Sequence, residues 1–176
     1  MQSQDFKIRR AAPSDAPAFV ELMRDPEVFS GLLQLPYPVE ERWRQLLQEQ
    51  AAPGKTDLHL VAERHGKLLG SAGLHPVGLS LRRRHAMALG ISVAAEEQGK
   101  GVGSALIAAL LDYADNWGQV LRTELTVYAD NDRALRLYKR FGFEREGLFK
   151  AHALRNGRYV DTVSMARLHP SPPALR

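Results

Sequence analysis

The stretch "VAAEEQGKGVGSALIAALLDYA", residues 93–114, decides the fold class of this chain. Gly99, Gly101 and Gly103 fall within five residues, after a run typical of a strand and before a run typical of a helix. Glycine adopts positive φ and leaves no Cβ between its backbone amides and a ligand. The start of the following helix adds unpaired N–H groups and the positive end of its dipole. These features are typical of a phosphate site, and a tight turn is the alternative.

Two common phosphate motifs do not fit this loop. The nucleoside-triphosphate loop G-x-x-x-x-G-K-[ST] does not match the order of residues here. The dinucleotide fingerprint G-x-G-x-x-G fails because Leu106 stands three residues after Gly103. The pattern that remains is Gln98-x-x-Gly101-x-Gly103, with Lys100 as an additional donor.

The strand before the loop separates large from small side chains. His85, Met87, Leu89, Ile91 and Val93 alternate with Ala86, Ala88, Gly90, Ser92 and Ala94. Small residues on one face allow something to approach the backbone closely. A ligand and a packed helix are both open as the approaching group.

Periodicity and turn signals give the order βααβββαβαββ, which predicts a single α/β (α+β) domain. Strands are expected at residues 6–11, 57–64, 67–77, 85–94 and 122–129, with two more around Asn156-Gly157. Helices are expected at residues 13–25, 38–50, 101–117 and 130–141, the second with Pro38 in its first turn. Residues 1–168 form the predicted domain, and residues 169–176 a flexible tail.

Composition excludes several classes of site. The chain has no cysteine, so disulfides, thiolate metal sites and a cysteine nucleophile are excluded. Its six histidines lack metal-ligand spacing, and we expect no metal. No apolar run approaches the length of a membrane span and no signal core is seen, which predicts a cytoplasmic protein without a membrane partner. The basic run "LRRRH" has no aromatic stacking platform, and we expect no nucleic acid.

Two motifs together resemble the GNAT superfamily of acyl-CoA-dependent N-acetyltransferases. The glycine loop is similar to the family signature Q/R-x-x-G-x-G/A after the fourth strand, and "ADNDRALRLYKRFGFEREG", residues 129–147, is similar to a later family motif. The resemblance implies a mixed, mostly antiparallel sheet with splayed fourth and fifth strands, flanked by helices. Residues 124–131, 150–161 and 33–38 further resemble a bacterial subgroup that acetylates small amines or free amino acids.

The resemblance implies acetyl-CoA as co-substrate. It implies that the pyrophosphate lies on the amides of the glycine loop and that the pantetheine arm pairs with the fourth strand like an added peptide strand. The residues implied in binding acetyl-CoA are Ile91, Ser92, Val93, Gln98, Gly99, Lys100, Gly101, Val102, Gly103, Ser104, Asn131 and Tyr138.

Tyr138 matches the family tyrosine that protonates the departing thiolate, and Asn131 matches the asparagine that binds the pantetheine. Helical spacing puts Asn131, Ala134 and Tyr138 on one helix face. A phenol with a pKa near 10 can donate to the thiolate of a thiol with a pKa near 8.5. From spacing alone, a core residue of an amphipathic helix is the simpler explanation of Tyr138.

Direct attack by the amine in a ternary complex is expected, since no cysteine and no G-x-S-x-G elbow can carry the acetyl group. Glu124 on the fifth strand is the predicted base, and His75 or a water relay is the alternative. An α-amine with a pKa near 8 is about a tenth neutral at pH 7 and therefore needs little help from a base.

The acceptor is predicted to be a small-molecule amine, most simply a hydrophobic amino acid. Its expected contacts are Phe29, Leu33, Leu35, Tyr37 and His75. The apolar loop at residues 29–38 carries this prediction, although a loop tucked onto the core explains it equally well. The alternative acceptors are a polyamine, a protein N-terminus or a lysine. A non-catalytic CoA-binding module is the alternative to an enzyme. We also expect a homodimer.

Overall fold

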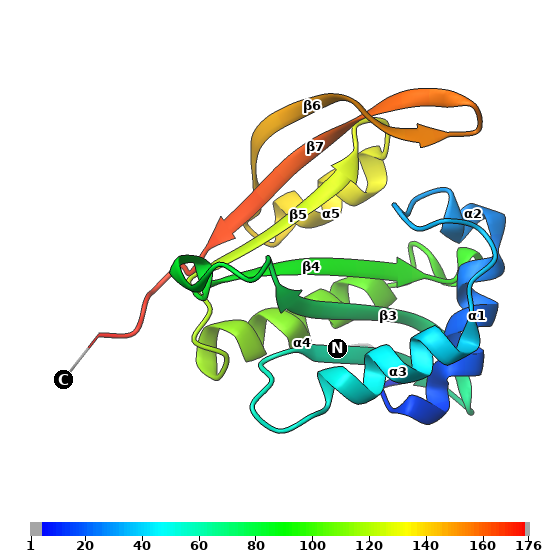
Figure 1. Ribbon diagram of the computed structural model, residues 1–176, viewed down its shortest axis with the longest axis horizontal. Coiled ribbons are helices and arrows are strands. Elements are labelled where there is room, and N and C mark those ends of the chain that lie inside the picture. The colour runs from blue at the N-terminus through cyan, green and yellow to red at the C-terminus, as the bar shows by residue number, and fades with distance from the viewer. Residues whose placement is uncertain (1–4, 175–176) are drawn as a thin grey trace. The chain divides into compact units, whose positions relative to one another are not determined.

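The computed structural model describes residues 5–174. Its strands are β1 (Lys7–Arg10), β2 (Leu58–Arg64), β3 (Lys67–Pro76), β4 (Ala86–Val93), β5 (Arg122–Tyr128), β6 (Glu144–Arg155) and β7 (Arg158–Leu168). Its helices are α1 (Ala16–Arg24), α2 (Pro26–Phe29), α3 (Glu40–Gln50), α4 (Val102–Asn116) and α5 (Asp132–Arg140) (Figure 1). Short 3-10 turns occupy Pro13–Asp15, Leu81–Arg83 and Ala95–Glu97.

The strands form a seven-stranded sheet in the order β1-β2-β3-β4-β5-β7-β6. The β1–β2, β2–β3, β5–β7 and β6–β7 pairs are antiparallel. β4 and β5 pair in parallel, residues 86–88 against residues 122–124. This mostly antiparallel sheet with flanking helices confirms the predicted fold class.

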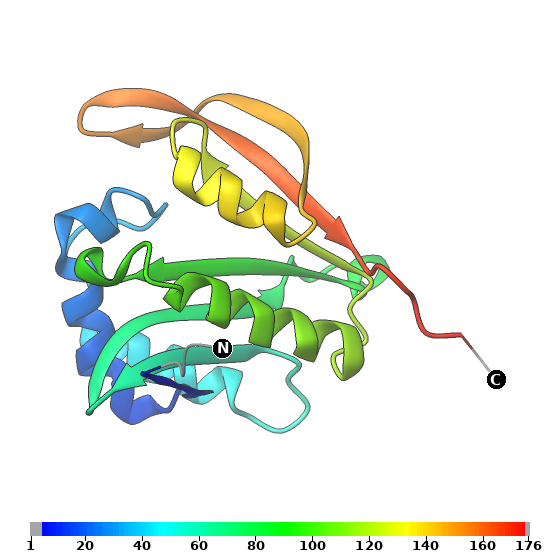
Figure 2. The same cartoon turned by 180° about the vertical axis from the view of Figure 1, so that it is seen from behind.

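The chain divides into two compact units. The first holds residues 5–74 and 90–110, and the second holds residues 75–89 and 111–174. In the first unit, α1 and α3 cover one face of β2 and β3, and the beginning of α4 lies on the opposite face (Figures 1 and 2).

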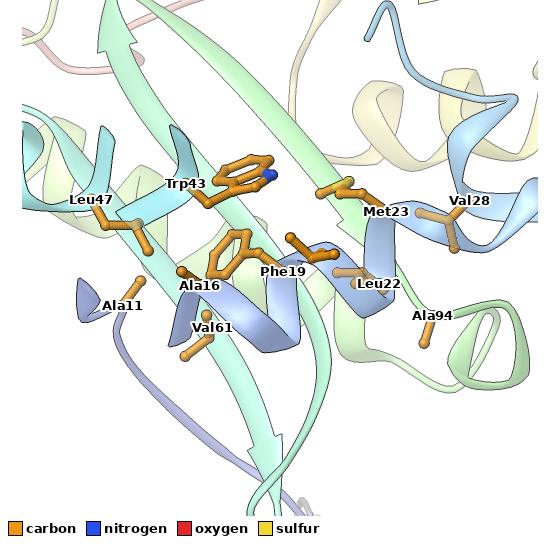
Figure 3. Packing of buried hydrophobic residues seen from close by; sticks show 11 residues of the cluster. Ala11, Ala16, Phe19, Leu22, Met23, Val28, Trp43, Leu47, Val61 and Ala94 are labelled. Carbon is orange, nitrogen blue, oxygen red and sulfur yellow. The ribbon is translucent and has the colours of Figure 1, made fainter. Parts of the chain in front are cut away.

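Aromatic packing forms the centre of the first unit. The Phe19 ring on α1 lies 4.7 Å from the Trp43 ring on α3, and both side chains are buried (Figure 3). At the edge of the sheet, Arg9 on β1 donates to Asp15 at 2.8 Å and to Glu63 on β2 at 2.6 Å. The apolar centre holds the helices against the sheet, and the ion-pair network links β1 to β2 and to the turn before α1.

Gly70 explains how closely β3 approaches the end of β4. A Cβ at this position would lie 2.8 Å from the carbonyl oxygen of Ser92 and 3.2 Å from the Cα of Val93. The amide of Ala94 donates to the carbonyl of Leu69 at 2.9 Å. Any larger residue at Gly70 would therefore push away the strand end that precedes the glycine loop.

In the second unit, β7 lies between β5 and β6, and α5 lies on one face of these strands (Figure 2). Asn131 caps α5, because its side-chain oxygen accepts from the Ala134 amide at 3.1 Å. Gly142 ends the helix with φ +82°, and the Phe143 amide donates to the Tyr138 carbonyl at 3.1 Å. The helix spans Asp132–Arg140, within the predicted range of residues 130–141.

Several predictions about helices need correction. The short helix α2 begins at Pro26, where no helix was expected. Pro38 precedes Val39, the N-cap residue of α3, and so does not lie in the first turn. Trp117 lies beyond the end of α4 and is 77% exposed, because the buried stripe of that helix ends at Ala114.

None of the helices in residues 5–174 combines the length and the apolar character needed to cross a membrane. Over the same residues, no group of three or more histidine, aspartate or glutamate side chains is arranged to hold a metal ion. The ends of the predicted domain and tail, residues 1–4 and 175–176, lie outside the described residues.

Candidate active site

The glycine loop has the backbone that its composition predicts. Gly99 has φ +79° and Gly101 has φ +91°, a region that residues with a Cβ rarely adopt. No atom lies within 4 Å of a Cβ added at either position. The glycines are therefore required by the backbone conformation and leave open space beside it.

Helix α4 begins directly after this loop. Its first intrahelical bond runs from the Ala105 amide to the Gly101 carbonyl at 3.0 Å. The amides of a first helical turn have no intrahelical acceptor, and the helix dipole places positive charge there. This 15-residue helix and the open glycine loop fit the pyrophosphate of a bound CoA.

A buried carboxylate directly before the glycine loop pairs with two basic side chains. Glu97 is 6% exposed, and Arg64 on β2 donates to it at 3.2 Å. Lys100 lies 3.8 Å from the same carboxylate. Sequence reasoning missed Arg64 and Glu97, because no local pattern links two residues 33 positions apart.

Residues at the end of β4 leave part of the strand backbone accessible to a ligand. A Cβ added at Gly90 would meet no atom within 4 Å, so a packed helix is not the reason for this glycine. Ile91 and Val93 are partly exposed. The Ser92 side chain is buried and lies 3.5 Å from the Ser71 hydroxyl. Ser92 can therefore meet a ligand through its main chain, as the strand-pairing prediction requires.

Tyr138 on α5 is buried beside Phe143, with ring centroids 5.8 Å apart. Burial raises the pKa of the Tyr138 phenol well above its ordinary value, so the hydroxyl keeps its proton at neutral pH. Desolvation would also raise the basicity of a thiolate nearby, which favours proton transfer to sulfur. Asn131 uses its side-chain oxygen as the helix cap and retains an NH₂ group that can donate to a ligand.

Glu124 on β5 is engaged by two arginines. Arg83 donates to both carboxylate oxygens at 2.9 and 2.8 Å, and Arg122 donates at 2.8 Å. Burial raises the pKa of the Glu124 carboxyl, but the hydrogen bonds from Arg122 and Arg83 outweigh it and the net pKa is lowered. A lowered pKa makes a weaker base, and these contacts weigh against Glu124 as the proton acceptor.

The apolar loop divides into a packed part and an exposed part. Leu32 packs against the core of the first unit. Leu35 is 86% exposed and Tyr37 is 91% exposed, with Tyr37 at φ +63°. Leu33 is also largely exposed, and Phe29 ends α2 partly buried. The packing of Leu32 does not account for the exposed residues.

The predicted site residues fall into two groups. The first unit contains Phe29, Leu33, Leu35, Tyr37, Ile91, Ser92, Val93 and residues 98–104. The second unit contains Glu124, Asn131, Tyr138 and His75, which is exposed near the end of β3. Within the first unit, the Gln98 side chain joins the glycine loop to the end of β4. Within the second unit, Asn131 and Tyr138 share α5 and its cap.

The chain matches known acetyltransferases in sequence and in fold. Residues 18–143 match the acetyltransferase (GNAT) family. The L-amino acid N-acetyltransferase AaaT of Escherichia coli (strain K12) is 40% identical over 164 residues, which cover 93% of this chain and 98% of that protein. The spermidine N(1)-acetyltransferase of Vibrio cholerae is 37% identical over 75 residues, 43% of each chain.

A solved structure of low sequence identity has the same fold. The phosphinothricin acetyltransferase from Sinorhizobium meliloti, crystallised with acetyl-CoA, superposes with a TM-score of 0.84 at 23% identity. The match covers 98% of this chain and 93% of that chain.

Proposed function

The chain belongs to the acetyltransferase (GNAT) family, and on that premise we propose that it transfers the acetyl group of acetyl-CoA to the α-amine of a small or hydrophobic amino acid. The observation that carries the proposal is the open, positive-φ glycine loop at the start of α4. Acetyl-CoA supplies an acetyl thioester, which is activated toward amines. The loop amides of residues 98–104 would bind its pyrophosphate, and the main chain of residues 91–93 would pair with its pantetheine arm.

Within the second unit, Tyr138 would donate its proton to the departing sulfur, and Asn131 would bind the pantetheine through its amide group. The buried, protonated phenol supports the first role, and the remaining NH₂ donor supports the second. The predicted attack is direct, so no acetyl-enzyme forms.

Three observations support an amino-acid acceptor over a polyamine. AaaT, a relative matched over nearly its full length, is named for L-amino acids. The segment with Leu33, Leu35 and Tyr37 presents apolar side chains to solvent, which suits a hydrophobic acceptor. Glu124 and Glu146 are each paired with an arginine, which leaves them less available to a polycation.

A thiol-release assay with acetyl-CoA tests the proposal across hydrophobic amino acids, glycine, spermidine and an N-terminal peptide. We expect kcat/KM to be highest for a hydrophobic amino acid. A higher kcat/KM for spermidine or the peptide than for every amino acid would reject the proposed acceptor. Binding of CoA without turnover of any amine would instead favour the binding-module alternative.

A cytoplasmic location, a homodimer, and the absence of nucleic-acid, membrane and metal partners stay predictions. Glu124, His75 and a water relay likewise stay open as predicted routes for the amine proton. The contacts of Glu124 with Arg83 and Arg122 weigh against the first of these.

A further inference from the structure

We propose that Arg64 controls how strongly the glycine loop binds the pyrophosphate of CoA, because it neutralises the Glu97 carboxylate and keeps the charge of Lys100 for the ligand. This inference rests on the proposed function and deepens it, since it gives a positioning role to a residue outside the loop. Arg64, Glu97 and Lys100 all belong to the first unit, as do the loop residues 98–104.

The β2–β3 hairpin brings two basic side chains to the segment before the loop. Arg64 ends β2 and pairs with Lys67, the first residue of β3, across a two-residue turn at residues 65–66 with both φ angles positive. Such a tight turn fixes the register of the strand ends. Arg64 contacts Glu97, and Nζ of Lys67 lies 2.8 Å from the carboxylate of Glu96.

The contact between Arg64 and Glu97 involves both carboxylate oxygens. One guanidinium nitrogen donates to Oε1 at 3.2 Å and the other to Oε2 at 3.3 Å. The Nε of Arg64 donates to the carbonyl of Asp5 at 3.2 Å, and the Asp5 carboxylate is exposed. The Glu97 side chain is only 8% exposed, so water does little to stabilise its charge and the arginine fork supplies the compensation.

The backbone of Glu97 belongs to the start of the loop. Its amide donates to the carbonyl of Ala94 at 2.9 Å, and its carbonyl accepts from the amide of Lys100 at 3.4 Å. The side chain that Arg64 fixes is therefore part of the same turn that carries Lys100. Any uncompensated charge on Glu97 would act directly beside the proposed pyrophosphate site.

Lys100 is placed to serve either the carboxylate or a ligand. Its Nζ lies 3.8 Å from Oε1 of Glu97, farther than the arginine nitrogens, and its side chain is 59% exposed. Because both oxygens already accept from Arg64, Glu97 does not depend on the ammonium group for compensation. Without Arg64, the nearly buried carboxylate would attract Lys100 and repel the two negative charges of a pyrophosphate.

The neighbouring ion pair offers a matched comparison. Lys67 and Glu96 join the same two segments as Arg64 and Glu97, but both of their side chains are exposed. Solvent and salt screen an exposed pair, so its loss has little effect on a ligand nearby. The effect of Arg64 is thus expected to come from the burial of Glu97 and not from net charge alone.

Calorimetry with CoA tests this role in wild type, Arg64→Gln, Glu97→Gln and the variant that carries both changes. We expect Arg64→Gln to weaken CoA binding by about tenfold. Glu97→Gln should bind CoA at least as tightly as wild type, although it breaks the same ion pair, because it removes the negative charge. The double variant should return to within about threefold of the wild-type dissociation constant, since neither charge remains.

Thermal unfolding of the same proteins separates this role from a structural one. Both single variants lose the ion pair and should be less stable, yet only Arg64→Gln should lose affinity. Lys67→Gln is the matched control and should change the dissociation constant by less than about twofold.

Weaker CoA binding by Glu97→Gln, comparable with that of Arg64→Gln, would reduce the pair to a structural role and overturn the inference. Unchanged affinity in a folded Arg64→Gln variant would also overturn it. If Arg64→Gln does not fold, the double variant decides, because weak binding by that protein contradicts the inference and near-wild-type binding supports it. A wild-type protein that does not bind CoA would overturn the proposed function itself.

Discussion

The side-chain amide of Gln98 donates to the carbonyl of Val93 at 3.2 Å, so the glycine loop is tied to the last residue of β4. The two segments that are proposed to hold the pantetheine and the pyrophosphate are thereby joined within one unit. A ligand that bridges them would meet a backbone whose spacing is already set, which lowers the ordering cost of binding.

Gly101→Val should weaken CoA binding by about tenfold or more. The change puts a β-branched side chain at φ +91° and fills open space beside the loop amides. Isothermal calorimetry with CoA measures the dissociation constant. Gly54→Val is the matched control, because Gly54 has φ +81° and equally open space outside the loop. It should show similar backbone strain with unchanged affinity, and equal affinities for both variants would remove the pyrophosphate site.

Tyr138→Phe should lower kcat by roughly 10²-fold with little change in the CoA dissociation constant. The variant removes the hydroxyl and keeps the ring that packs against Phe143. Single-turnover rates under saturating substrates measure the effect. Tyr159→Phe, at a 72% exposed tyrosine of β7, is the control and should retain full activity. A near-normal rate for Tyr138→Phe would show that another donor protonates the sulfur.

Leu35→Ser should raise the KM for a hydrophobic amino acid by roughly 5–30-fold, the equivalent of about 1–2 kcal/mol of lost apolar contact. The KM for glycine should change much less, since glycine offers no side chain to cover. Thermal stability should be preserved, because Leu35 is 86% exposed. Leu79→Ser, at a fully exposed leucine of the second unit, is the control. A KM increase of equal size for glycine and the hydrophobic acceptor would argue against side-chain recognition.

Asp15→Asn should flatten the acid limb of the stability curve. The hydrogen bond from Arg9 holds the pKa of the Asp15 carboxyl below its ordinary value. The folded pKa therefore lies below the unfolded one, near 3.9, so the stabilisation is complete above about pH 5 and is lost as pH falls through the folded pKa. Urea unfolding at a series of pH values measures the slope.

Asp112→Asn serves as the control for that slope, because Asp112 is exposed and its hydrogen-bond partner is the neutral side chain of Asn116. The control should keep the wild-type slope. At pH 7 the Asp15→Asn variant should be less stable by roughly 1–3 kcal/mol, since Arg9 loses a charged partner. A slope equal to that of wild type would mean that Asp15 does not couple to folding through its charge.

Local chemistry made the glycine loop and the ends of α5 predictable from the sequence. Gly101 and Gly142 adopt the positive φ that glycine allows, and Asn131 has a side chain suited to an N-cap, so each residue type indicates its own backbone conformation. The sequence could not distinguish the exposed part of the apolar loop from the packed part, because Leu32 and Leu35 are the same residue type in the same segment.

Local residue chemistry could not predict which charged residues far apart in the sequence pair with each other. Arg64 stands 33 positions from Glu97, and Arg83 stands 41 positions from Glu124, so that only folding brings these pairs together.

His169 determines where the chain can be shortened. Its amide donates to the carbonyl of Leu121 at 2.8 Å, and its Nε2 lies 3.0 Å from the carbonyl oxygen of Asp115. Truncation after Leu168 would remove both contacts, one to the end of α4 and one to the residue just before β5, whereas truncation after Ser171 would keep them. For crystallisation or for a C-terminal fusion partner, the chain should therefore be cut beyond His169, because a shorter chain loses the contacts that join its C-terminal strand to the connection between α4 and β5.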